Sequence, residues 1–84
     1  MEDARTINLE KISPNRRSVY DDESIEAMVR SIRAEGQMEP VRLWFSGSSF
    51  RLLDGEKRWR AMKMLGAAEI KAIIEGIGPE SWND

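Results

Sequence analysis

The spacing of apolar residues changes several times along this chain, and the order of those changes is what most constrains the fold. Residues 6–12 alternate apolar and polar side chains, which is the period of a half-buried strand. Residues 41–45 and 50–53 are again rich in apolar and aromatic side chains, and the short polar stretch 46–49 between them predicts a hairpin. Between the first strand and the hairpin, apolar residues recur at the i, i+3, i+4 and i+7 positions of one helix face, namely Ile25, Met28, Val29 and Ile32.

The ends of this first helix carry recognisable signals. Asp21 or Asp22 can cap its N-terminus, because a short acidic side chain accepts a hydrogen bond from the first turn. Gly36 is the natural residue to end it, and Pro40 follows shortly afterwards. Pro14 ends the preceding strand because it has no N–H for a ladder. A helix of about three turns is therefore predicted between these signals.

A second helix is predicted from Gly55 to Leu65, and a fourth strand over 69–74. Trp59, Met62 and Leu65 recur at core-facing spacing in this helix, which favours packing over base stacking for Trp59. The order β-α-β-β-α-β predicts an α+β fold, with two main helices against a small mixed sheet of about four strands. We expect one domain over residues 1–84, with a core of about 6–75 and a loose tail at 76–84.

The chain has no cysteine and no histidine. This excludes disulfide scaffolds, zinc fingers, thiol chemistry and histidine-based acid–base catalysis. Hydrophobic residues make up 40% of the sequence, but no apolar run approaches the ~20 residues of a membrane span, and the acidic start is unlike a signal peptide. We therefore expect a cytoplasmic domain, with association to the nucleoid as an option.

Charge is distributed unevenly. The net charge is −2 and the sequence pI is about 5.2, so the overall basic character of a DNA-binding domain is missing. Residues 41–63, however, carry a net +4 between two flanking segments of −3 each. Either a solvated charged face or an anion-binding surface explains this pattern.

The basic segment is most informative at residues 52–61, where a strand ends, a glycine permits a tight turn and a helix begins. Free N–H groups and the positive end of the helix dipole attract anions at such a point. Lys57 and Arg58 in the first turn disfavour the helix electrostatically, which suggests that an anion binds there, while Glu56 offsets part of the repulsion. The alternative is that both cations point into water and Asp54 caps the helix.

These residues resemble the N-terminal domain of the ParB family of chromosome- and plasmid-partition proteins, the "ParB-like nuclease" fold shared with sulfiredoxin. Residues 55–61, Gly-Glu-Lys-Arg-Trp-Arg-Ala, look like that family's G-E-R/K-R-x-R-A box. Residues 31–41 are similar to its S-I-x-x-x-G-x-x-x-P-[IV] segment, and Ile12 with Pro14 and Asn15 matches the start of the domain. The resemblance covers about residues 6–75.

The resemblance implies a site for a nucleoside triphosphate, CTP as in partition proteins or ATP as in sulfiredoxin, with or without Mg²⁺. We assign no catalytic and no metal-ligating residue in this chain. The residues expected to bind the phosphates are Gly55, Glu56, Lys57, Arg58 and Arg60. Those expected on the base and ribose side are Gly36, Gln37 and Pro40.

The chain also departs from the family. Sulfiredoxin needs a catalytic cysteine and a histidine that this sequence lacks, which excludes that activity. Partition proteins usually carry a Q-P-R element where residues 16–18 read Arg-Arg-Ser, and they continue into an E-N-x-Q-R element and a helix-turn-helix that these 84 residues do not contain. The chain is either an excised domain or a stand-alone minimal member, and we expect DNA binding to be weak or to need additional domains.

The leading hypothesis is a nucleotide-phosphate-binding regulatory module of a ParB-like DNA-partition or transcription-related protein. Catalysis, as weak NTPase or nuclease activity, is the less favoured option. One alternative is direct nucleic-acid binding or nuclease action through the cations of residues 41–63, against the acidic pI. The other is a protein-interaction or homodimerisation module. Its candidate exposed apolar residues are Met38, Trp44, Phe45 and Trp82.

Overall fold

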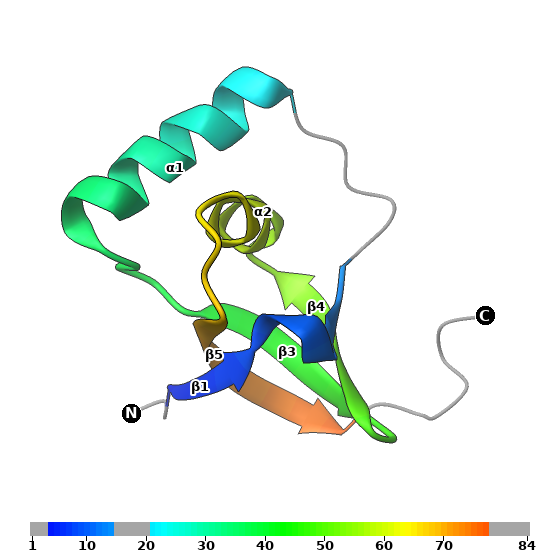
Figure 1. Cartoon of the computed structure of the whole chain (residues 1–84). Helices are drawn as coiled ribbons and strands as arrows, with labels where there is room; N and C mark the ends of the chain where they lie inside the picture. The colour runs from blue at the N-terminus through cyan, green and yellow to red at the C-terminus, as the bar shows by residue number, and fades with distance from the viewer. Residues whose placement is uncertain (1–3, 15–20, 78–84) are drawn as a thin grey trace.

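Two helices cover one face of a mixed five-stranded sheet in the computed structural model, which describes residues 4–14 and 21–77 (Figure 1). The strand order is β1-β5-β3-β4-β2, with β3 parallel to β5, β2 parallel to β4 and the other pairs antiparallel. The predicted α+β class is confirmed, with five strands in place of about four. In chain order the elements are β1 (Arg5–Asn8), the 3₁₀ helix η1 (Leu9–Lys11), β2 (Ile12–Ser13), α1 (Asp22–Glu35), β3 (Val41–Ser46), β4 (Ser49–Asp54), α2 (Glu56–Met64) and β5 (Glu69–Ile77).

The prediction of one strand over residues 6–12 is wrong, because η1 divides it. The side chain of Asn8 accepts a hydrogen bond from the Glu10 amide at 2.9 Å, which is the local geometry that starts a turn. The first half then pairs with β5 at one edge of the sheet, and the second half pairs with β4 at the opposite edge. Leu9 and Ile12 are both buried, so the turn preserves the apolar positions that the alternation revealed.

Helix α1 follows its predicted signals closely. The carboxylate of Asp21 accepts the Ser24 amide at 2.8 Å, and Gly36 ends the helix with a φ of 78° and an N–H that donates to the Ile32 carbonyl. The helix has 14 residues, nearly a turn more than expected. Its apolar stripe faces α2, where Ile25 and Val29 pack with Ala61.

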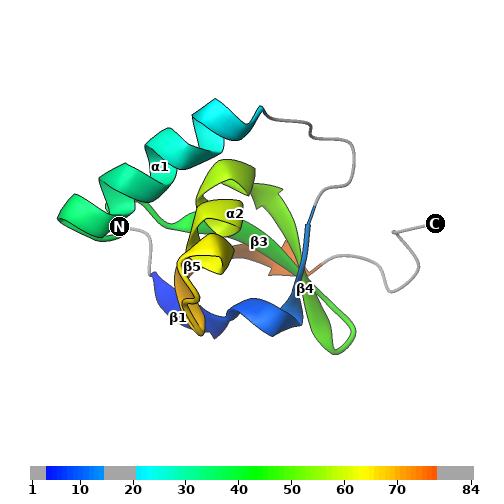
Figure 2. The same ribbon diagram turned by 45° about the horizontal axis from the view of Figure 1, so that its top comes forward.

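Helix α2 lies between α1 and the sheet, so it has two buried sides (Figure 2). Trp59 belongs to the cluster on the sheet side, which confirms that the tryptophan is a core residue. Ala61 belongs to the cluster shared with α1. Helix α2 is therefore held from both sides at a fixed position above the sheet.

The hairpin of β3 and β4 is confirmed, with Leu43 opposite Leu52 in its register and a turn at residues 47–48. Strand β5 runs three residues farther than predicted, so Gly76 and Ile77 belong to the sheet and not to the expected tail. Residues 78–84, with Trp82, and residues 15–20 lie outside the described residues. Within the described ranges, no helix combines the length and apolar character that crossing a membrane requires.

Candidate functional site

The start of α2 is shaped by Gly55, which has a φ of 104° and lies against β3. A β-carbon at this position would lie 2.6 Å from Cγ1 of Val41, so only glycine fits without displacing the strand. Asp54 does not cap the helix as the alternative reading expected, because Gly55 is the N-cap and supplies no side-chain hydrogen bond. The first helical hydrogen bond runs from the Trp59 amide to the Gly55 carbonyl, so the amides of residues 56–58 precede it at the positive end of the helix dipole.

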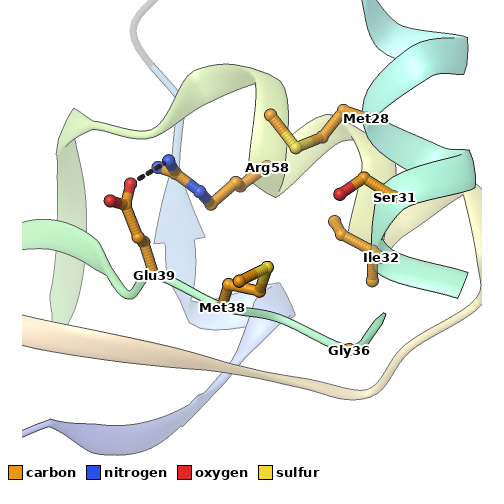
Figure 3. A pocket seen from close by; sticks show the side chains of 7 residues that line it. All are labelled: Met28, Ser31, Ile32, Gly36, Met38, Glu39 and Arg58. Atoms are coloured by element: carbon orange, nitrogen blue, oxygen red, sulfur yellow. Dashed lines mark hydrogen bonds and ion pairs between the residues drawn. The ribbon is translucent and has the colours of Figure 1, made fainter. Parts of the chain in front are cut away.

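A pocket of about 260 Å³ lies beside this helix start, between α1 and the loop that joins α1 to β3 (Figure 3). Its α1 wall and its floor carry mainly apolar side chains, and the guanidinium of Arg58 closes the opposite side. The lining residues are Met28, Ser31, Ile32, Gly36, Met38, Glu39 and Arg58. The arrangement combines a cation with an apolar wall, which suits a ligand that has both an anionic and a less polar part.

Arg58 is the cation that reaches this pocket. Its Nη2 donates to Oε1 of Glu39 at 2.5 Å, across 19 residues of sequence. The side chain of Arg58 is 24% exposed and that of Glu39 is 71% exposed, so the pair lies at the solvent boundary. Arg58 is therefore partly fixed and still accessible to a ligand from solution.

Lys57 and Arg58 differ in the groups on which their charges act. The pKa of Asp21 is lowered mainly by hydrogen bonds from the backbone and side chain of Ser24, and the positive charge of Lys57 lowers it further. Lys57 thus acts toward the N-terminus of α1, whereas Arg58 lines the pocket. The sequence grouped the two cations, and the structure separates them.

Glu56 and Arg60 form an ion pair within α2. Nε of Arg60 donates to Oε2 of Glu56 at 2.8 Å, and Glu56 is only 4% exposed. These two residues of the predicted phosphate box are bound to each other, one turn apart. Their pairing braces the first turn of α2 from which Arg58 extends.

The three residues expected on the base and ribose side lie in the loop before β3, in different settings. Gly36 lines the pocket, and Pro40 leads directly into β3. The side chain of Gln37 instead turns to β5, where Nε2 donates to the Lys71 carbonyl at 2.9 Å and Oε1 accepts the Lys71 amide at 2.8 Å. Nε2 also donates to the Glu39 carbonyl at 2.9 Å, so Gln37 fastens the loop to the sheet.

Sequence reasoning did not identify Glu39 or the methionines of the pocket as site residues. Glu39 precedes Pro40 and is separated from Arg58 by a strand pair, so no local spacing signals the contact. Met28 was recognised as part of the apolar stripe of α1, but it lies at the edge of that stripe and borders the pocket. Met38 is 71% exposed, as the interaction hypothesis expected.

The aromatic residues expected to be exposed are partly buried, and cations of residues 41–63 contact acidic or aromatic side chains of the domain. Phe45 packs against Phe50 with ring centroids 5.2 Å apart, and Trp44 is half-buried. Several cations of residues 41–63 are held by neighbours within the domain: Arg42 by Glu75, Arg58 by Glu39, Arg60 by Glu56, and Lys63 above the ring of Trp59. In residues 4–14 and 21–77, no group of three or more acidic side chains is arranged to hold a metal ion.

Two helices on one face of a mixed five-stranded sheet are the architecture of ParB/sulfiredoxin-like domains. The chain matches the ParB N-terminal domain over residues 1–81, and it belongs to that family. It is 38% identical over 80 residues to the nucleoid occlusion protein of Geobacillus sp. (strain WCH70), covering 90% of this chain and 28% of that protein. It is 32% identical over 72 residues to the chromosome-partitioning protein ParB of Myxococcus xanthus, covering 86% and 24% respectively. The chain thus spans about a quarter of the length of these relatives.

Solved structures share the fold. Sulfiredoxin from Arabidopsis thaliana superposes with a TM-score of 0.81 at 23% identity, over 95% of this chain and 91% of that one. ParB from Caulobacter crescentus complexed with CTP-γ-S gives 0.80 at 23% identity, over 90% and 46%. A free serine kinase in complex with AMP gives 0.78 at 25% identity, over 87% and 31%.

Proposed function

We propose that this chain binds a nucleoside triphosphate, with the phosphates over the N-terminus of α2 and the nucleoside toward the pocket between α1 and the loop before β3. One observation carries this proposal: the guanidinium of Arg58 lies at the junction between the α2 start and the pocket (Figure 3). Backbone amides and a guanidinium together suit a phosphate, and the apolar α1 wall suits a base. A pocket of about 260 Å³ is small for a complete ligand, which is consistent with phosphates outside it.

Each expected site residue has a role in this proposal. Gly55 provides the turn, Arg58 grips phosphate oxygens, and Lys57 adds positive charge at the same helix start. Glu56 and Arg60 act through their mutual ion pair, which positions the first turn. In the loop before β3, Gly36 and Pro40 shape the nucleoside side, and Gln37 fixes the loop to β5.

The relatives support a nucleotide and leave its identity open. The Caulobacter crescentus ParB was solved with CTP-γ-S, and the serine kinase with AMP. CTP and ATP are therefore the first candidates, with or without Mg²⁺. In the cell, the domain would act as a regulatory module of a ParB-like partition or transcription-related protein, in the cytoplasm or at the nucleoid, with DNA reading supplied by other domains.

Isothermal titration of the full chain with CTP, ATP and GTP, each with and without Mg²⁺, tests the proposal. We expect binding tighter than millimolar for at least one nucleotide, and a loss of that binding in Lys57→Ala/Arg58→Ala. The control is Arg5→Ala/Lys11→Ala, which removes the same charge from exposed positions in the edge strand β1 and in η1. No binding below millimolar, or equal binding by both double variants, contradicts the proposal.

Direct action on DNA is less well supported by this geometry. Cations of residues 41–63 already have acidic or aromatic neighbours, which offset their charge toward a phosphate backbone. A gel-shift and a plasmid-nicking assay at low salt are expected to be negative for the isolated chain. A clear shift would favour a nucleic-acid interface instead.

A further inference from the structure

The carboxylate of Glu39 accepts a hydrogen bond from Arg58, the side chain that binds the phosphates in the proposed function. The two groups contact each other on the side of the pocket opposite the α1 wall (Figure 3). A carboxylate and a phosphate offer a guanidinium the same kind of anionic oxygen. A phosphate that approaches Arg58 therefore competes with an acceptor that the chain already supplies.

The loop backbone keeps this acceptor in place. The Glu39 carbonyl accepts Nε2 of Gln37, and the same amide group makes two further hydrogen bonds to the backbone of Lys71 in β5. Pro40 follows with a restricted φ and leads into β3. The backbone of Glu39 is thus held on its N-terminal side by Gln37, which is bonded to β5, and on its C-terminal side by β3.

The exposure of the pair makes it displaceable. The Glu39 side chain is 71% exposed, and exposed ion pairs contribute little to stability because water solvates both partners. The contact is therefore strong enough to orient Arg58 without a ligand and weak enough to yield to a multiply charged one. Once displaced from Arg58, the Glu39 carboxylate still lies beside the pocket and repels an anion bound there.

We propose that Glu39 sets the anion affinity of this site by acting as an internal competitor for Arg58. This inference rests on the proposed function, whose ligand is the anion that displaces Glu39. The geometry predicts that Glu39→Gln, which keeps the size and removes the charge, tightens CTP binding about two- to fivefold, the range of an exposed pair. The gain should disappear when Arg58 is absent.

The test uses the full chain and four variants: Glu39→Gln, Arg58→Ala, their combination, and Glu35→Gln as the control. Glu35 is an exposed acid at the end of α1, so its substitution makes the same change in net charge without touching Arg58. CTP with Mg²⁺ is titrated calorimetrically into each. Separately, the ligand-free variants are labelled with phenylglyoxal, an arginine reagent, and modification of Arg58 is followed by peptide mass spectrometry.

We expect faster labelling of Arg58 and tighter CTP binding in Glu39→Gln than in Glu35→Gln, with no gain from Glu39→Gln in the Arg58→Ala background. Unchanged labelling overturns the masking of Arg58. Faster labelling with CTP binding no tighter than in Glu35→Gln overturns the role of Glu39 in affinity. If no variant binds CTP, ATP or GTP, both the proposed function and the role of Glu39 in nucleotide affinity are wrong. The labelling rates then still show whether Glu39 masks Arg58.

Discussion

Gly55 lies so close to Val41 that a β-carbon added to the glycine would stand 2.6 Å from Cγ1 and 3.2 Å from the α-carbon of the valine. Val41 is fully buried at the start of β3 and cannot move without disturbing the centre of the sheet. The contact sets how closely the first turn of α2 approaches the strand. The site residues that follow Gly55 depend on this approach.

Gly55→Ala is therefore expected to destabilise the domain by about 2–4 kcal/mol, from the positive φ and the overlap with Val41 together. Gly47→Ala is the matched control, because Gly47 also has a positive φ but nothing lies near its added β-carbon. Urea denaturation followed by circular dichroism measures both. Equal losses in the two variants would show that the Val41 contact contributes nothing.

Arg58 and Arg60 are two residues apart in α2, but their substitution should have opposite consequences. Arg60→Ala removes one charged donor, at 2.8 Å, from the buried carboxylate of Glu56, at a cost of about 1–3 kcal/mol of stability. Arg58→Ala removes only an exposed pair, with an effect within about 1 kcal/mol, but it should weaken nucleotide binding about tenfold or more.

Denaturation and calorimetric titration of the two variants, beside Arg30→Ala on the exposed side of α1, separate these effects. The prediction fails if Arg58→Ala strongly lowers the free energy of unfolding while the folded variant still binds the nucleotide as tightly as wild type. In that case Arg58 is a structural ion-pair partner and not a phosphate ligand.

Trp59 is nearly buried, at 8% exposure, and its Nε1 has no hydrogen-bond partner among the described residues. Trp59→Ala should destabilise the domain by about 3–5 kcal/mol through the cavity it leaves. Trp59→Phe should cost clearly less, because it keeps most of the ring volume and removes an unsatisfied donor whose burial is itself unfavourable by about 1–3 kcal/mol. Urea midpoints of both variants decide the matter, and similar losses would mean that Nε1 is satisfied in solution.

The lowered pKa of Asp21 predicts that the stability of the domain depends on pH in the acidic range. Hydrogen bonds from Ser24 hold the pKa of its carboxyl below the ordinary value of 3.8, with a smaller contribution from the charge of Lys57. The folded state therefore favours the carboxylate, and the resulting stability is complete above pH 3.8 and is lost as pH falls through the lowered folded-state pKa. Asp21→Asn retains a capping oxygen without this titration. The stability difference between wild type and Asp21→Asn should shrink on acidification, and a constant difference would contradict the assignment.

The elements that sequence could predict are those whose signals are local. The apolar stripe of α1 has its cap at Asp21 and its end at Gly36, all within one stretch of chain, and the hairpin turn lies between two apolar runs. Residue chemistry alone favours Arg58 over Lys57 as a phosphate ligand, because a planar guanidinium can grip two oxygens. The structure adds that Arg58 is the one that lines the pocket.

The features that sequence missed depend on segments that meet only after folding. Glu39 contacts Arg58 across 19 residues, and Gln37 contacts Lys71 across 34. The split of the first strand had a local cause in Asn8, but alternation continues through the turn and conceals it. Asp54 was a reasonable cap by residue type, and it failed because the left-handed Gly55 takes the N-cap position.

An amide chemical-shift titration tests most directly whether phosphate binds at the α2 start. The ¹⁵N-labelled chain is titrated with CTP and Mg²⁺, and shifts are followed for the backbone amides, Gly36 and the Arg58 side-chain Nε–H. We expect the largest changes at the amides of residues 56–58, at Arg58 Nε–H and at Gly36, with the hairpin turn at residues 47–48 unmoved. Shifts confined to other surfaces, with residues 56–58 unchanged at saturation, would contradict it.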